Sequence, residues 1–157
     1  HLVSLLGTAE DETTFDVGEN KEESARVQAV CNYFGPTDFA AFAQTPGYEG
    51  ADDPNGAVGK LLDGAPSEET ETAKAASPVT YVSADDPPFL ILHGTEDPLV
   101  PLDQSERLYS ALQRAGVPAT LVVFPGAGHG GGPFVQPRTT ARIAEFFARH
   151  LRAEEMP

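Results

Sequence analysis

An aspartate and a histidine, 32 residues apart, follow two apolar segments in the second half of the chain. Asp97 lies in HGTEDP, directly after the apolar run FLIL, and His129 lies in PGAGHG, after LVVF. If the two runs are neighbouring strands of a parallel sheet, the loops at their carboxyl ends meet at one edge of that sheet. Asp97 and His129 are then candidates for a hydrogen-bonded pair in which the carboxylate orients the imidazole, as nucleophilic catalysis by serine requires.

Other interpretations of these loops stay open in the sequence. Glu96 is a second carboxylate beside Asp97, and Asp97 before Pro98 is also typical of a simple turn. His129 in a glycine-rich loop also suits a surface histidine, whereas His93 is expected to be a packed core residue rather than a second base. The string HGGG that begins at His129 is similar to an oxyanion-hole motif, but that motif precedes the nucleophile in chain order, so we interpret His129 as the base.

The segment from residue 88 onwards has the order strand, helix, strand, helix. PPFLIL predicts a strand buried on both faces, and ATLVVF predicts the next strand over Ala119–Phe124. Early acidic residues and a final glycine predict a helix over Pro101–Gly116. Pro137 begins the last helix, whose inward-facing residues are expected to be Ile143, Phe146, Phe147 and Leu151. This alternation predicts an α/β fold with a mostly parallel sheet and helices on both faces.

The start of the chain indicates the end of a helix followed by a loop and a strand. Leu2, Leu5 and Leu6 have the spacing of a helix face, with Gly7 as the expected C-cap. The run over Arg26–Phe34 is rich in β-forming residues and is expected to be a strand.

A second irregular region precedes the buried strand. Asp38 is expected to cap a short helix over Phe39–Ala43. Residues 45–76 are expected to be a loop-rich insertion within the same domain. It would contain a short helix over Ala57–Leu62 and another that starts at Ser67 and ends before a proline.

Composition excludes several classes of protein. The 157 residues suit one domain, and 10 Lys+Arg against 24 Asp+Glu argue against nucleic acid or an anionic membrane as partner. No apolar run reaches the roughly 18 residues of a membrane span. One cysteine, Cys31, excludes a disulfide-stapled scaffold and is expected to be buried and inert. These numbers leave the cellular compartment open.

Seven of the acidic residues lie between Glu10 and Glu23, without apolar periodicity. This pattern predicts a solvated loop. A calcium site is the alternative, but the ligand spacing of a calcium loop is absent. We therefore expect no metal there.

Together these motifs resemble the α/β-hydrolase superfamily. HGTEDPLVP, followed by GAGHG, is similar to the acid and base loops of that fold. With VQAVCNYFGPTDF and ASPVTYVSADDPPFLILHG, residues 1–157 resemble the C-terminal half of the esterase and lipase subgroup that includes bifunctional feruloyl and acetyl-xylan esterases. The resemblance implies a single, partial α/β-hydrolase domain in which Asp97 is the acid and His129 the base of a catalytic triad.

The nucleophile of that family has no counterpart in the sequence, because Gly-x-Ser-x-Gly does not occur. In the family a His-Leu pair commonly continues the helix after the nucleophile, so His1 and Leu2 imply a serine four positions before His1. We therefore expect an internal fragment or a truncated form, with a mature N-terminus after signal removal as the alternative. The chain alone is expected to be inactive because it lacks the nucleophile and the oxyanion hole. Cys31 is not expected to replace the serine, since it lies within a predicted strand.

The resemblance implies a serine-type carboxylic ester hydrolase that forms an acyl-enzyme and needs neither metal nor cofactor. The substrate would be a small-molecule or polysaccharide-linked ester. One alternative is the C-terminal part of a prolyl-oligopeptidase-type serine peptidase; another is a non-catalytic half-domain that forms a homodimer through an exposed sheet edge. Four further residues lie in or beside the candidate site loops, without an assigned role: Tyr33, Phe34, Asp38 and Phe134.

Overall fold

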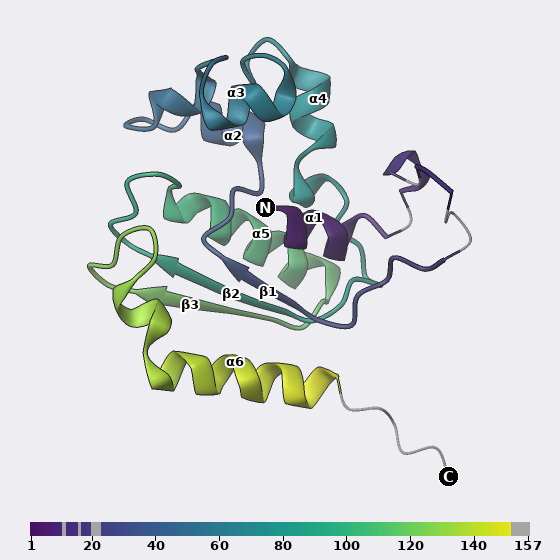
Figure 1. The fold of residues 1–157 in the computed structure, drawn as a ribbon, viewed down its shortest axis with the longest axis vertical. Coiled ribbons are helices and arrows are strands. Elements are labelled where there is room, and N and C mark those ends of the chain that lie inside the picture. The colour runs from purple at the N-terminus through teal and green to yellow at the C-terminus, as the bar shows by residue number, and fades with distance from the viewer. Residues whose placement is uncertain (11, 16, 20–22, 152–157) are drawn as a thin grey trace.

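Three parallel strands form the sheet of the computed structural model, which describes residues 1–10, 12–15, 17–19 and 23–151 (Figure 1). β1 (Val30–Tyr33), β2 (Phe89–Gly94) and β3 (Ala119–Phe124) lie in that order, and Phe89 is opposite Val30 on one side and Ala119 on the other. Every residue of β2 is buried, as the apolar run predicts. The carboxyl ends of the strands therefore share one edge of the sheet.

Helices cover both faces of this sheet (Figure 1). Phe89 and Ile91 of β2 pack against α5 on one face, and Leu90 and Leu92 pack in a cluster with α6 on the other. Successive strand residues point to opposite faces, so a strand that is apolar throughout needs a covering layer on each side. The predicted α/β fold is confirmed.

The helices are α1 (Leu2–Thr8), α2 (Phe39–Ala43), α3 (Ala57–Leu62), α4 (Thr70–Ala75), α5 (Leu102–Ala115) and α6 (Pro137–His150), with short 3-10 turns at Thr13–Phe15, Glu49–Asp52, Pro78–Thr80 and Gly132–Val135. Of the helices in the described residues, none has the length and apolar character needed to cross a membrane.

The two long helices follow their sequence signals closely. α5 ends at Gly116, whose left-handed backbone (φ +80°) is what a C-cap glycine provides, and α6 begins at Pro137. Ile143 and Phe146 of α6 pack towards the sheet as predicted. The prediction for Leu151 is wrong: it follows the last residue of α6 and is 48% exposed.

The prediction for the first helix is wrong in two respects. The buried residues of α1 are the small ones, Ser4, Gly7 and Thr8, while Leu2 and Leu6 are 70% and 47% exposed. Gly7 lies within the helix rather than at its C-cap. The helix packs so closely on the sheet that a Cβ at Gly7 would collide with a side chain of β1. Small side chains therefore face the sheet, and the leucines do not.

β1 begins at Val30 rather than at Arg26, because its neighbour offers no earlier partner. The first bond of the ladder joins the Val30 N–H to the Pro88 carbonyl at 2.9 Å. Pro87 and Pro88 have no N–H to donate, so β2 starts at Phe89. The residues before Val30, which the sequence places in the first strand, are therefore irregular.

Residues 45–76 pack with α2 into a second apolar cluster, seen at the top of Figure 1. Asp38 caps α2 as predicted, since its side chain accepts the Ala41 N–H at 3.0 Å. The helix predicted from Ser67 begins only at Thr70. Ser67 instead donates its N–H and hydroxyl to the Asp52 carboxylate at 2.9 and 2.7 Å, which closes a loop and leaves no side chain to cap α4.

Cys31 is half-buried in β1 rather than fully buried. Burial raises the pKa of its thiol to about 11, so the thiol is protonated at neutral pH. A protonated thiol is a poor nucleophile, in agreement with the expectation that this cysteine is inert.

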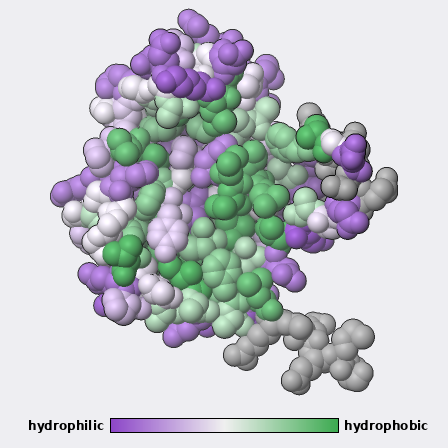
Figure 2. Space-filling view, in the orientation of Figure 1, coloured by the Kyte–Doolittle hydropathy of each residue, from purple (hydrophilic) through white to green (hydrophobic). Residues whose placement is uncertain are grey.

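Both outer strands have an unpaired edge, and one helix face is exposed. Within the described residues β1 and β3 each pair with β2 alone, and Leu2, Val3 and Leu6 of α1 are 70%, 51% and 47% exposed. Figure 2 shows an apolar area at the centre of the molecule, where α1 lies in the same orientation in Figure 1. Unpaired strand edges and contiguous apolar faces favour association with another chain. The homodimer predicted from the sequence stays a prediction.

We expect light scattering of the isolated chain to give a mass above that of one copy. Leu6→Lys should shift the distribution towards the monomer, because it introduces a charge into the exposed face of α1. Val135→Lys is the matched control, since Val135 is 73% exposed at a different place in the chain. A monomeric wild-type chain, or an equal effect of both variants, would contradict the prediction.

Candidate functional site

The loops that follow β2 and β3 lie side by side, because the strands are neighbours with Gly94 opposite Phe124. Backbone hydrogen bonds join the loops: the Thr95 N–H donates to the Phe124 carbonyl at 3.1 Å and the Glu96 N–H to the Ala127 carbonyl at 2.9 Å. A Cβ at Gly94 would collide with the Ala127 backbone. Glycine at this position therefore allows the two loops to approach each other.

Asp97 and His129 are hydrogen bonded across these loops. His129 Nδ1 lies 2.8 Å from Asp97 Oδ2, and Asp97 Oδ1 accepts the N–H groups of Leu99 and Val100 at 2.9 and 3.0 Å. The Asp97 side chain is fully buried, so these donors offset the cost of removing its charge from water. An ionised carboxylate only accepts, so in a neutral imidazole paired with it Nδ1 carries the hydrogen and Nε2 has the lone pair. The structure brings together the pair selected from the sequence, and its catalytic role stays a prediction.

An aromatic ring supports the imidazole. The centroid of the Phe34 ring lies 4.2 Å from that of His129, and 5.0 Å from that of Phe134, which it meets edge to face. Phe34 has φ +41°, a conformation uncommon for residues other than glycine and one that tends to occur at functional sites. The His129 side chain is left 30% exposed.

Tyr48 connects the segment 45–76 to the acid loop. Its hydroxyl donates to the main-chain carbonyl of Asp97 at 2.6 Å. Burial and, secondarily, the Asp97 charge raise the pKa of Tyr48, so the phenol keeps its hydrogen at neutral pH. Tyr48 was not among the candidates from the sequence, since nothing in residues 45–76 distinguishes one tyrosine for a contact with residue 97.

His93 is completely buried beside Asp97, so the prediction of a packed core histidine is confirmed. Its Nδ1 lies 2.7 Å from Ser105 Oγ and its Nε2 lies 2.9 Å from the Val100 carbonyl oxygen. Burial lowers the pKa of His93, and this effect outweighs the opposing influence of the Val100 carbonyl and the Asp97 charge. The ring is therefore neutral near pH 7.

A buried neutral histidine is expected to make the protein less stable in mild acid. The folded pKa of His93 lies below the value of about 6.5 for an unfolded chain, so the unfolded state binds the proton first as the pH falls. This contribution to the free energy of unfolding is complete above about pH 6.5 and decreases below it, by at most ~1.4 kcal/mol per pH unit. Urea unfolding of wild type and His93→Gln at several pH values measures it. Parallel pH curves for the two proteins would contradict the prediction.

A cavity of about 660 Å³ opens beside His129. Its wall includes Tyr33 at the end of β1, Phe34 directly after it, Leu99 of the acid loop, and Tyr48 of the segment 45–76. Among the described residues, the Nε2 of His129 has no hydrogen-bond partner. The arrangement offers a basic nitrogen to a mostly apolar space that is large enough for a small organic molecule.

The remaining sequence candidates lie around this pair without joining it. Glu96 is exposed, so the buried Asp97 and not its neighbour meets His129. Asp38 caps α2 and lies 3.5 Å from Arg107. Tyr33 and Phe134 belong to the aromatic cluster around the base loop, with their ring centroids 6.1 Å apart.

The buried serines have other partners. Ser4 accepts the side-chain N–H of Asn32, Ser77 accepts the N–H of Phe39, and Ser105 is bonded to His93. None of these hydroxyls is hydrogen bonded to the imidazole of the candidate base in the part of the chain that the structure describes.

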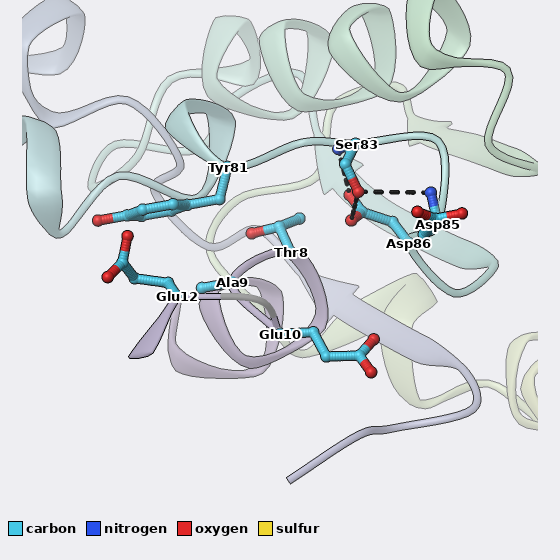
Figure 3. A pocket seen from close by; sticks show the side chains of 8 residues that line it. All are labelled: Thr8, Ala9, Glu10, Glu12, Tyr81, Ser83, Asp85 and Asp86. Atoms are coloured by element: carbon cyan, nitrogen blue, oxygen red, sulfur yellow. Dashed lines mark hydrogen bonds between the residues drawn. The ribbon is translucent and has the colours of Figure 1, made fainter. Parts of the chain in front are cut away.

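The acidic segment forms no metal site in the described residues. Glu10 and Glu12 line a small pocket with Asp85 and Asp86 (Figure 3). The two aspartates precede β2, whereas the Asp97 loop follows it, so the pocket lies at the other end of this strand. The two glutamate carboxylates point in different directions (Figure 3), and the Ser83 hydroxyl is bonded to Asp86 at 3.0 Å. Three acidic residues of this segment lie outside the described residues: Asp11, Asp16 and Glu22.

Residues 1–112 match the family described as BD-FAE. The matched part contains α1, the insertion, β2 and the loop of Asp97, while His129 follows it. More than half of the chain is therefore covered by one family description.

Similarities to individual proteins are consistent with this family match. The chain is 33% identical over 119 residues to a probable carboxylic ester hydrolase, LipM, of Mycobacterium tuberculosis (73% of this chain, 26% of the relative). It is 36% identical over 88 residues to an uncharacterized peptidase, YuxL, of Bacillus subtilis (54% and 13%). A truncated form of a carbohydrate esterase from gut microbiota superimposes with a TM-score of 0.79 at 29% identity, over 96% of this chain and 55% of that one. The chain thus spans about half the length of this solved structure and about a quarter or less of the two curated relatives.

Proposed function

This chain belongs to the BD-FAE family of α/β-hydrolase esterases, and on that premise we propose that it supplies the acid and the base of a serine carboxylic ester hydrolase. The observation that carries the proposal is the hydrogen bond of 2.8 Å between the buried Asp97 and His129, whose other ring nitrogen is free of protein partners among the described residues. An ester would bind in the cavity beside that imidazole.

In the proposed reaction His129 Nε2 takes the proton of a serine hydroxyl as its oxygen attacks the ester carbonyl. The imidazolium then gives this proton to the leaving alcohol oxygen, and an acyl-enzyme remains. Water repeats the sequence, with its proton taken by Nε2 and returned to the serine as the acid leaves. Asp97 keeps Nδ1 protonated throughout and stabilises the imidazolium.

We propose that the serine lies outside these 157 residues, four positions before His1. His1 lines the same cavity as His129, and its Nε2 lies 2.7 Å from the Ala76 carbonyl oxygen. Residues four apart along a helix share a face, so a serine about one turn earlier would be near the cavity. The partners of the buried Ser4, Ser77 and Ser105 support a nucleophile from elsewhere.

A fluorophosphonate probe, which modifies activated serines, tests this proposal. We expect the protein extended by the sequence encoded before His1 to be labelled at the serine of a Gly-x-Ser-x-Gly motif, and the 157-residue chain to remain unlabelled. Peptide mapping identifies the modified residue. Labelling of a serine or of Cys31 within the isolated chain would contradict the assignment.

A serine peptidase of the prolyl-oligopeptidase type is the second candidate, supported by the similarity to the Bacillus subtilis peptidase. The two reactions share the triad and differ in the leaving group. If the extended protein is an esterase, it should hydrolyse p-nitrophenyl acetate at a higher rate than prolyl p-nitroanilides. The reverse preference would favour the peptidase.

A further inference from the structure

The ring of His93 has a fixed hydrogen position. A carbonyl oxygen only accepts, so Nε2, 2.9 Å from the Val100 carbonyl, must carry the hydrogen. Nδ1 then accepts the hydroxyl hydrogen of Ser105 at 2.7 Å. With no exposed surface and both nitrogens bonded, the imidazole has one orientation and one tautomer.

This ring and the acid share a backbone group. The Val100 N–H donates to Asp97 Oδ1 at 3.0 Å, while the Val100 carbonyl accepts from His93. His93 Nε2 also lies 3.5 Å from Asp97 Oδ2, the oxygen that accepts from His129 at 2.8 Å. The Nε2–H of His93 thus holds the turn at residues 97–100 and presents the positive end of its dipole to the carboxylate.

We propose that His93 is a positioning residue for the triad, and that Ser105 helps to hold its ring in place. The expected effect of His93 on catalysis rests on the proposed function. Its expected effect on the hydrogen bond between Asp97 and His129 does not. Without the Nε2–H, the turn at Val100 loses one anchor and Asp97 Oδ2 loses the dipole that faces it, so the carboxylate is held only by the N–H groups at Oδ1 and its bond to His129 is less well oriented. His129 would then populate the tautomer with hydrogen on Nε2, which leaves no lone pair on that nitrogen to take the serine proton.

Two substitutions separate positioning from packing. His93→Leu fills a similar volume without a donor, whereas His93→Gln can bring a side-chain N–H to the place of Nε2. In the extended protein we expect His93→Leu to lower kcat for p-nitrophenyl acetate about 10- to 100-fold with little change in KM, as misplacement of a catalytic group does. His93→Gln should recover most of this loss. If the two variants have equal kcat, or if His93→Leu matches wild type, His93 only packs and the proposal is overturned.

A second measurement does not depend on activity. Nitrogen-15 NMR of the imidazole distinguishes the two tautomers of His129 in the isolated chain. We expect wild type and His93→Gln to hold the hydrogen on Nδ1, and His93→Leu to give a mixture. If the extended wild type hydrolyses no ester, the proposed function fails, and this spectrum still decides the role of His93. An unchanged His129 spectrum in a folded His93→Leu protein overturns the proposal.

Ser105→Ala makes the test with a smaller change, should His93→Leu fail to fold. Loss of the hydroxyl leaves His93 Nδ1 without its donor, so the bond to the Val100 carbonyl alone holds the ring and the Nε2–H is placed less firmly. We expect a severalfold fall in kcat and the same mixed tautomers at His129. A wild-type His129 spectrum in this variant contradicts the proposal. Ser110→Ala, also on α5, is the matched control.

Discussion

Replacement of His129 with alanine is expected to lower kcat for p-nitrophenyl acetate by about 10⁴- to 10⁶-fold in the protein that carries the proposed serine. The variant loses the nitrogen that takes the serine proton, so both formation and hydrolysis of the acyl-enzyme lose their base. KM should change little, because the apolar wall formed by Tyr33, Leu99 and Tyr48 remains. Initial rates at mildly alkaline pH measure both constants.

A second histidine provides the control for this experiment. His150 is the last residue of α6, and its ring packs on Phe146 with centroids 4.9 Å apart. His150→Ala should therefore hydrolyse the ester at the wild-type rate. If His129→Ala keeps more than about a tenth of the wild-type kcat, the base is another group and the proposed triad is wrong.

The elements that carry the pair were predictable because their signals are local. Prolines before Phe89 start a buried strand, Gly116 ends a helix, and the loops of Asp97 and His129 follow strands directly. Once parallel neighbours are assumed, the common edge of the sheet brings the loops together without further information. This is why 32 residues of separation did not obscure the pair.

The packing of α1 was not predictable from periodicity. Its leucines have the spacing of a buried face, yet Ser4 and Thr8 are buried instead. Ser4 is bonded to Asn32, and the Thr8 hydroxyl donates to the Pro78 carbonyl at 3.1 Å. These partners lie 28 and 70 residues away in the sequence, so the local spacing of residues in α1 cannot predict these contacts. The face of α1 that is buried is therefore the one with small side chains, because the helix lies close to the sheet and the buried hydroxyls find hydrogen-bond partners there.

The supporting residues of the site were unpredictable for the same reason. Tyr48 reaches the Asp97 carbonyl from an insertion whose sequence indicates only loops and short helices. The sequence indicated that His93 is buried, but not that it shares the Val100 backbone with the acid. The choice between Glu96 and Asp97 also needed the structure, since adjacent residues of one loop differ here in burial rather than in type.

Asp97→Asn is expected to lower kcat by about 10⁴-fold while leaving the protein folded. The amide oxygen can still accept the N–H groups of Leu99 and Val100, so the turn keeps its anchors. The amide nitrogen, however, must donate where the carboxylate accepted. His129 Nδ1 then has to accept, its hydrogen moves to Nε2, and the nitrogen next to the substrate can no longer take a proton.

Glu96→Gln distinguishes this loss of orientation from a loss of charge. Both substitutions remove one negative charge from the same loop, but Glu96 is exposed and Asp97 is hydrogen bonded to His129 at 2.8 Å. A carboxylate in water is screened and fixes no tautomer, so Glu96→Gln should keep kcat within about twofold of wild type. Equal losses in the two variants would mean that the acidic field of the loop, and not the Asp97–His129 hydrogen bond, supports the base. A 10⁴-fold loss confined to Asp97→Asn would assign that role to the single bond between them.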